Sequence, residues 1–130
     1  MTDIIQQAPK KQILLVEDEQ FLSTLLKNRL EKDGFEVTLA RDGEEAVNLL
    51  KTVKPSLVLL DLILPKMSGF DVLEAINSDP QLHKAPVMII SNLGQESDIE
   101  RGKELGAVDY FIKAKISIDD LIKEVKKRAE

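Results

Sequence analysis

Short apolar runs alternate with segments of helical periodicity five times along this chain of 130 residues. Each run is too short for a helix and is rich in branched side chains, which favours a buried strand. The predicted strands are Gln12–Val16, Phe35–Ala40, Leu57–Leu60, Val87–Ile90 and Val108–Ile112. Repeated strand–helix alternation indicates a parallel sheet covered by helices on both faces. We therefore predict an α/β fold, a doubly wound sheet of five parallel strands in the order 2-1-3-4-5 with five helices.

The segments between the strands predict the helices. The first helix carries its apolar residues at Phe21, Leu22, Leu25, Leu26 and Leu30. The second is predicted between Asp42-Gly43 and Pro55, and the third after Gly69. The fourth, from Ser97 to Leu105, has few apolar residues and contains Gly102, which suits an element of low local stability. The last helix has its buried face at Ile118, Leu121, Ile122 and Val125.

Polar residues follow four of the five predicted strands. Glu17 and Asp18 follow the first strand, Asp61 the third, Ser91 the fourth and Lys113 the fifth. The second strand, which is expected at the edge, ends in Leu39 and Ala40 and offers no candidate for this site. Because ligands of such sheets bind at the carboxyl ends of neighbouring strands, we expect the polar residues to face one crevice.

The acidic residues of this crevice indicate a divalent metal. Carboxylates at close range raise one another's pKa unless a cation neutralises them. Oxygen ligands with no Cys or His nearby favour Mg²⁺, which also accepts phosphate oxygens. Alternatively, Glu17 and Asp18 serve only to stabilise the N-terminus of the following helix by interacting with its dipole. That alternative leaves unexplained why Asp61 follows a buried strand, where an unpaired carboxylate is costly.

Lys113 and Ser91 each allow two interpretations. The ammonium group of Lys113 supplies a counter-charge that would stabilise a transferred phosphoryl group. As an alternative, Lys113 is an ordinary lysine whose stem lies on apolar surface. Ser91 is either a cap for the following helix or a hydroxyl donor to a phosphoryl oxygen. The four strand ends taken together favour a phosphoryl site.

Composition narrows the class of protein. A net charge of −5 argues against general nucleic-acid binding. No apolar run is long enough to span a membrane or to act as a signal peptide, so cytoplasmic localisation is expected. The basic segment of Lys123, Lys126, Lys127 and Arg128 is interpreted as a solvated helix face, with a contact surface for an acidic partner as the alternative. His83, the only histidine, is not expected to be a ligand or base.

Three segments resemble motifs of the receiver (response regulator) domain of two-component signal transduction. Ile13–Glu19 resembles its acidic opening motif, and Gly106–Lys113 resembles the segment that brings in a lysine. Asp61–Gly69 resembles the D-x-x-M-P-x-M-x-G signature. The resemblance covers about residues 11–128, and it implies the flavodoxin-like form of the predicted fold.

The resemblance also implies site roles. Asp61 would be the phosphoacceptor, and Mg²⁺ would be held by Glu17, Asp18, Asp61 and the backbone carbonyl of Ile63. Lys113 would bind the phosphoryl group. Ser91 would be the switch hydroxyl and Tyr110 the switch aromatic, which rotates inward when Ser91 moves.

The resemblance further implies partners and an output surface. The phosphoryl donor would be a histidine kinase or a phosphotransfer protein, and the only self-catalysed reaction would be slow dephosphorylation. The fourth helix, fifth strand and fifth helix would form the output face toward a downstream protein target. We expect a monomer that associates on phosphorylation, without membrane or direct nucleic-acid binding.

Two positions depart from the family pattern, and two others bear on the lifetime of the acyl phosphate. Ala114 follows Lys113 where the family usually has proline, so we predict a trans Lys113–Ala114 bond. Asn92 stands after Ser91 where a small residue is common, which would crowd the phosphoryl pocket. Ile63 and Leu93 occupy positions that tune hydrolysis of the acyl phosphate in this family, and neither can orient water, so slow self-dephosphorylation is predicted.

Other functions fit less well. A flavin-binding module would need a Gly/Ser/Thr-rich phosphate loop after the first strand, and a haloacid dehalogenase-type phosphatase would need an acid at Ile63. The serious alternative is a phosphorylation-independent pseudo-receiver that acts as a protein-interaction module. We expect residues 1–10 to be a flexible leader and residues 11–130 to be the receiver domain, either stand-alone or part of a longer chain.

Overall fold

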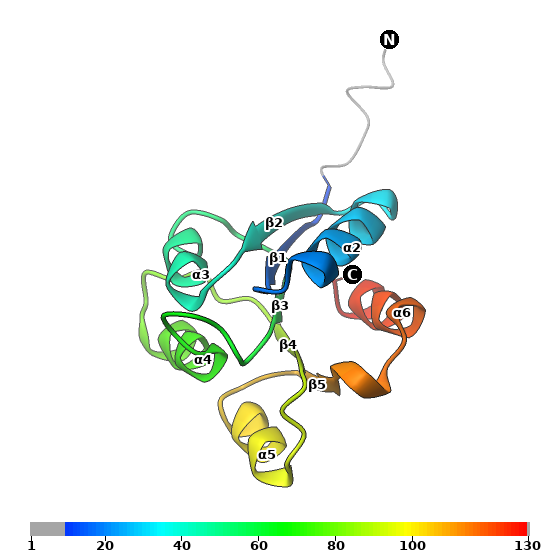
Figure 1. Ribbon diagram of the computed structural model, residues 1–130. Coiled ribbons are helices and arrows are strands. Elements are labelled where there is room, and N and C mark those ends of the chain that lie inside the picture. Colours follow the sequence, from blue (N-terminus) through cyan, green and yellow to red (C-terminus); the bar gives the residue numbers. More distant parts are fainter. Residues whose placement is uncertain (1–9, 130) are drawn as a thin grey trace.

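The computed structural model describes residues 10–129, and its centre is one parallel sheet (Figure 1). The strands are β1 (Gln12–Val16), β2 (Glu36–Ala40), β3 (Leu57–Leu60), β4 (Val87–Ser91) and β5 (Asp109–Ile112). Their order is β2-β1-β3-β4-β5, and every pairing is parallel. The predicted fold class and strand order are confirmed.

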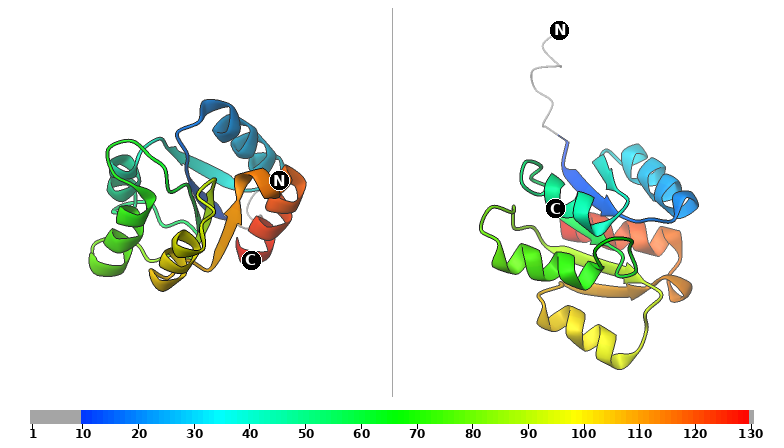
Figure 2. Two further views of the ribbon diagram at one scale, coloured as in Figure 1. Left: turned by 60° about the horizontal axis from the view of Figure 1, so that its bottom comes forward. Right: turned by 60° about the vertical axis from the view of Figure 1, so that its left-hand side comes forward.

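Five α-helices cover the two faces of the sheet. They are α2 (Gln20–Lys32), α3 (Gly43–Leu49), α4 (Gly69–Ser78), α5 (Glu96–Glu104) and α6 (Ile118–Ala129). A 3₁₀ turn, η1 (Lys113–Lys115), joins β5 to the last helix. Helices α2 and α6 lie on one face, and α3, α4 and α5 lie on the other (Figure 2).

The central strands are apolar on both sides because each face packs against helices. In β1, Leu14 and Val16 pack with α3 and α4, whereas Ile13 and Leu15 pack with α2 and α6. All four side chains are fully buried. This two-sided burial is expected for a central parallel strand, and it leaves only the strand ends for polar chemistry.

Two helices differ from the prediction. Helix α3 ends at Leu49 instead of continuing to Pro55, and the chain then closes a turn in which the Val53 N–H donates to the Leu49 carbonyl at 2.7 Å. The helical region is disfavoured for Lys54 because it precedes Pro55, so a helix could not have continued to the proline. In α2, Phe21 is 79% exposed, so its assignment to the apolar stripe was wrong. Successive helical residues turn by about 100°, which places Phe21 nearly opposite the buried Leu30.

The ends of the domain bear on two further expectations. The predicted leader, residues 1–10, lies outside the described residues except for Lys10. Among residues 10–129, no helix combines the length and apolarity needed to cross a membrane. The four residues of the basic segment are all exposed, and three of them pair with acids of this chain: Lys126 with Asp33, Lys127 with Glu124, and Arg128 with Asp109.

Candidate functional site

The carboxyl ends of β1, β3, β4 and β5 surround one cleft of about 330 Å³. Its walls are formed by Glu17, Asp18, Glu19, Asp61, Ile63, Asn92 and Lys113. The structure therefore brings together five of the residues singled out from the sequence. Two others, Ser91 and Tyr110, do not line the cleft, and neither does His83.

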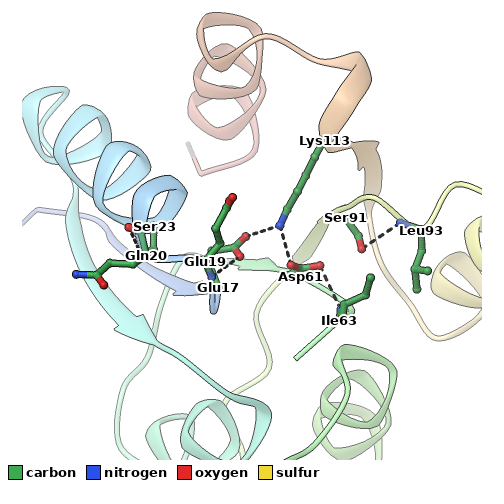
Figure 3. A network of polar contacts seen from close by, with 9 residues as sticks. All are labelled: Glu17, Glu19, Gln20, Ser23, Asp61, Ile63, Ser91, Leu93 and Lys113. Carbon is green, nitrogen blue, oxygen red and sulfur yellow. Dashed lines mark hydrogen bonds and ion pairs between the residues drawn. The ribbon is translucent and has the colours of Figure 1, made fainter. Parts of the chain in front are cut away.

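Lys113 joins two buried carboxylates at the centre of this cleft (Figure 3). Its Nζ lies 2.7 Å from Asp61 Oδ2 and 2.9 Å from Glu17 Oε1. Glu17 is 1% exposed and Asp61 is 5% exposed. One ammonium group, from the residue after β5, thus links a carboxylate just after β1 with a carboxylate just after β3. Lys113 is therefore not merely a lysine with its stem on apolar surface, because its charge is used within the cleft.

The pKa values of this pair reflect burial and pairing. Burial raises the pKa of Glu17, although its bonds with Lys113 and with the Glu19 N–H oppose that rise. For Lys113, burial alone would lower the pKa, but the close pairing of the ammonium with Asp61 and Glu17 outweighs it and raises the pKa. The ammonium group therefore remains charged across the physiological range.

Glu17 keeps an incompletely satisfied oxygen. Its Oε2 accepts a hydrogen bond from the Glu19 N–H at 3.0 Å. Its Oε1 has the Lys113 ammonium at 2.9 Å but no hydrogen bond of good geometry. A buried carboxylate oxygen without a directed donor is costly, and a cation in the cleft would satisfy it. Because Glu17 is buried, the alternative that it merely answers a helix dipole does not describe it.

Asp61 is fixed by the loop between β3 and α4. Its Oδ1 accepts a hydrogen bond from the Ile63 N–H at 3.2 Å. The loop then returns so closely that a Cβ on Gly69 would lie 2.3 Å from the Asp61 carbonyl oxygen. The glycine that ends the D-x-x-M-P-x-M-x-G segment thus allows α4 to begin directly against the acidic residue.

The donor set of the cleft suits a hard divalent cation. Glu17 and Asp61 offer buried carboxylate oxygens, and the exposed Asp18 offers a third carboxylate in the same wall. Among residues 10–129, however, no three Asp, Glu, His or Cys side chains form a preassembled metal group. In this arrangement the Lys113 ammonium occupies the position between the two buried carboxylates. A metal ion bound to Glu17 would therefore compete with the Lys113 ammonium for that carboxylate.

Ser91 and Tyr110 both bond to the backbone of one residue, Leu93. Ser91 is fully buried at the end of β4, and its Oγ accepts a hydrogen bond from the Leu93 N–H at 3.4 Å. The Tyr110 hydroxyl donates to the carbonyl of Leu93. Burial raises the pKa of Tyr110 to about 12, with smaller contributions from Asp98 and Asp61. The alternative that Ser91 caps the next helix is wrong, because Gln95 holds that position.

Besides Glu19, Asn92 is a cleft residue that sequence reasoning did not assign to the site. It was expected only to crowd the pocket, and the structure places it in the wall that faces Asp61 and Lys113. The available signal was its position directly after Ser91, at the end of a strand that carries site chemistry. The Lys113–Ala114 bond is trans, as predicted, since no cis peptide occurs within residues 10–129.

Comparisons with known proteins agree with this geometry. A model of the response regulator receiver domain matches residues 13–126. The transcriptional regulatory protein CpxR of Escherichia coli (strain K12) is 46% identical over 101 residues, which are 78% of this chain and 42% of that relative. The alkaline phosphatase synthesis transcriptional regulatory protein PhoP of Bacillus subtilis (strain 168) is 36% identical over 122 residues, 92% of this chain and 50% of that relative.

A solved structure supports the same assignment. The non-phosphorylated HemR receiver domain of Leptospira biflexa is 33% identical, with a TM-score of 0.84, and the match covers 93% of this chain and 95% of that one. The chain spans half or less of the length of the two transcriptional regulators. The family match covers most of the chain, so this chain belongs to the response regulator receiver domain family.

Proposed function

We propose that this receiver domain, a regulatory rather than a catalytic domain, accepts a phosphoryl group on Asp61 from a histidine kinase or a phosphotransfer protein. The observation that carries the proposal is the position of Asp61. Its carboxylate is nearly buried, is paired with one ammonium group, and borders a cleft that is open to solvent. In the reaction, an Asp61 oxygen forms a bond to phosphorus while the phosphorus–nitrogen bond of the donor breaks, and the nitrogen keeps the electron pair.

The side chains of the cleft position the reactants. Lys113 holds Asp61 in place before transfer and can then follow the phosphoryl oxygens, because its ammonium already lies 2.7 Å from Asp61 Oδ2. Glu17, Asp18, Asp61 and the Ile63 carbonyl would hold Mg²⁺, which would neutralise negative charge during transfer. The two apolar neighbours Ile63 and Leu93 offer no group that orients water, so the acyl phosphate should persist.

We expect the effect of phosphorylation to pass from Ser91 to Tyr110 through the backbone of Leu93. If Ser91 turns toward the phosphoryl group, its hydrogen bond with the Leu93 N–H is disturbed, and the Leu93 carbonyl that holds Tyr110 moves with it. Tyr110 also lines a groove of about 430 Å³ between α5, β5 and α6. We propose this face as the surface that contacts a downstream protein target in the cytoplasm and associates with a second copy on phosphorylation.

Acetyl phosphate with Mg²⁺ tests the proposal. Intact-mass measurement should show one added phosphoryl group on the wild type and none on Asp61→Ala. Asp61→Asn is the matched control, because it keeps the shape of the side chain while it removes the nucleophile. Modification of both variants would show that another residue accepts the phosphoryl group. Absence of modification in the wild type would favour the alternative that the chain is a phosphorylation-independent interaction module.

The partners require a separate experiment. A pull-down with the phosphorylated wild type, the unphosphorylated wild type and Asp61→Ala should recover the downstream target only, or most strongly, with the phosphorylated form. Equal recovery with all three forms would contradict a phosphorylation-dependent output.

A further inference from the structure

We propose that the side-chain amide of Asn92 is a hydrogen-bond donor to the phosphoryl group carried by Asp61. The inference rests on the proposed function and adds to it a binding residue particular to this chain. It contradicts our expectation from the sequence that Asn92 would act mainly as an obstacle in the phosphoryl pocket.

Asn92 differs in kind from the other residues of the cleft wall. Four of them are acids, one is the lysine and one is Ile63. Asn92 is therefore the only neutral side chain in this wall that can donate a hydrogen bond, and its amide group carries two N–H donors. Asn92 is exposed, and among the hydrogen bonds of residues 10–129 its side chain makes none. A free donor thus borders the space where a phosphoryl group would stand.

Charge makes such a donor valuable at this position. A phosphoryl group would add negative charge to a cleft that already contains Glu17, Asp18, Glu19 and Asp61. Lys113 is the one cation in the wall, and it is shared between two carboxylates. The Asn92 amide, unlike the Lys113 ammonium, can donate to a phosphoryl oxygen without giving up an existing partner.

The expected switch hydroxyl does not fill this role in the observed arrangement. Ser91 is fully buried, does not line the cleft, and has its Oγ against the Leu93 N–H. Asn92 follows it directly and does line the cleft. In the observed arrangement, Asn92 and not Ser91 is therefore the residue of this segment that lines the cleft.

A steric role and a donor role predict opposite results. If Asn92 only occupies space, shortening it should improve access and binding. If it donates a hydrogen bond, shortening it should weaken binding. Asn92 is exposed, so its variants should fold normally, which thermal unfolding would verify.

Binding of beryllium fluoride in the presence of Mg²⁺, followed by ¹⁹F NMR, separates these roles because the probe mimics a tetrahedral phosphoryl group on a carboxylate. We expect Asn92→Ala to bind it about three- to tenfold more weakly, in line with the net contribution of a single hydrogen bond. Asn92→Leu keeps the bulk without the donor and should bind as weakly. Asn92→Asp should bind more weakly still, because it adds a fifth acid.

Two controls complete the experiment. Asn48→Ala removes an exposed asparagine of α3, outside this cleft, and should leave affinity unchanged. Mg²⁺ affinity without beryllium fluoride should be the same in Asn92→Ala and the wild type. Unchanged or tighter beryllium fluoride binding by Asn92→Ala overturns the inference while the proposed function stands. Absence of binding by the wild type overturns the proposed function and this inference with it.

Discussion

At the scale of single residues, Ile63 bears on the lifetime of the phosphoryl group proposed for Asp61. It is 58% exposed and lines the cleft two residues after Asp61. An apolar side chain at this place cannot hold a water molecule in line with the acyl phosphate.

We predict that Ile63→Asn shortens the lifetime of phosphorylated Asp61 about fivefold or more, because an amide can orient the attacking water. The measurement is the decay of the phosphorylated species by intact mass after the donor is removed. Ile63→Ala is the matched control, since it opens the cleft without adding a polar group. Equal lifetimes in Ile63→Asn and the wild type would contradict the prediction.

Tyr110 gives a second prediction at this scale. It is the only tyrosine, and the chain has no tryptophan, so its ionisation can be followed directly by ultraviolet absorbance. Burial raises its pKa to about 12 from an ordinary value of 10.0, so the folded protein should titrate near pH 12 and the unfolded chain near pH 10. The folded state keeps a proton that the unfolded state has lost in this interval, so stability falls as pH rises from 10 to 12. A folded-state transition near pH 10 would refute this.

At the scale of elements, α5 is attached to the domain by few contacts. Gly102 is its only buried residue, and a Cβ there would lie 2.7 Å from the Ile89 Cδ1, so the glycine also serves close packing. Arg101 lies over the Phe70 ring at 4.2 Å from its centroid and pairs with Glu74 at 3.8 Å. These contacts tie α5 to α4 at the surface, while its first turn lacks a side-chain cap.

We therefore predict that Gln95→Ser stabilises α5 locally by about 1 kcal/mol, because serine can accept a hydrogen bond from the first-turn N–H groups. Hydrogen exchange of the α5 amides measures the effect, and their protection should increase. Gln81→Ser, in a loop where no helix begins, is the control. Unchanged protection in α5 would show that its opening is not limited by the missing cap.

The elements also show what the sequence could predict. Strands were located within one residue because their apolar runs are bounded sharply, and their polar ends located the cleft. The exposure of Phe21 was missed because the spacing of the apolar residues in α2 fits more than one choice of buried face. Only tertiary packing decides which face is buried. The orientation of Ser91 and the exposure of Asn92 were missed because the path of the loop decides which of two adjacent side chains faces the cleft.

At the scale of the whole molecule, the sheet brings three distant segments to one electrostatic centre. Glu17, Asp61 and Lys113 are far apart in the chain, yet they share one ion-pair network beneath the cleft. Their balance therefore contributes to the stability of the whole fold as well as to the proposed chemistry.

We predict that Lys113→Met lowers the free energy of unfolding without metal by about 3 kcal/mol, because it leaves two buried carboxylates unpaired. The same change should tighten Mg²⁺ binding about fivefold or more, since the ion no longer competes with an ammonium group. Thermal unfolding with and without Mg²⁺ tests both effects, and the stabilisation by Mg²⁺ should be larger in the variant. Lys115→Met, in the same 3₁₀ turn but exposed, is the control. Equal Mg²⁺ affinity in Lys113→Met and the wild type would contradict the competition.

The exposed ring of Phe21 has a practical consequence. It stands in the first turn of α2, two residues beyond Glu19 in the cleft wall, and is almost fully in water. Since no core packing depends on it, tryptophan can replace it at little cost and would be the sole indole of the chain. Its emission would then respond to events at the mouth of the cleft in real time, without an attached dye.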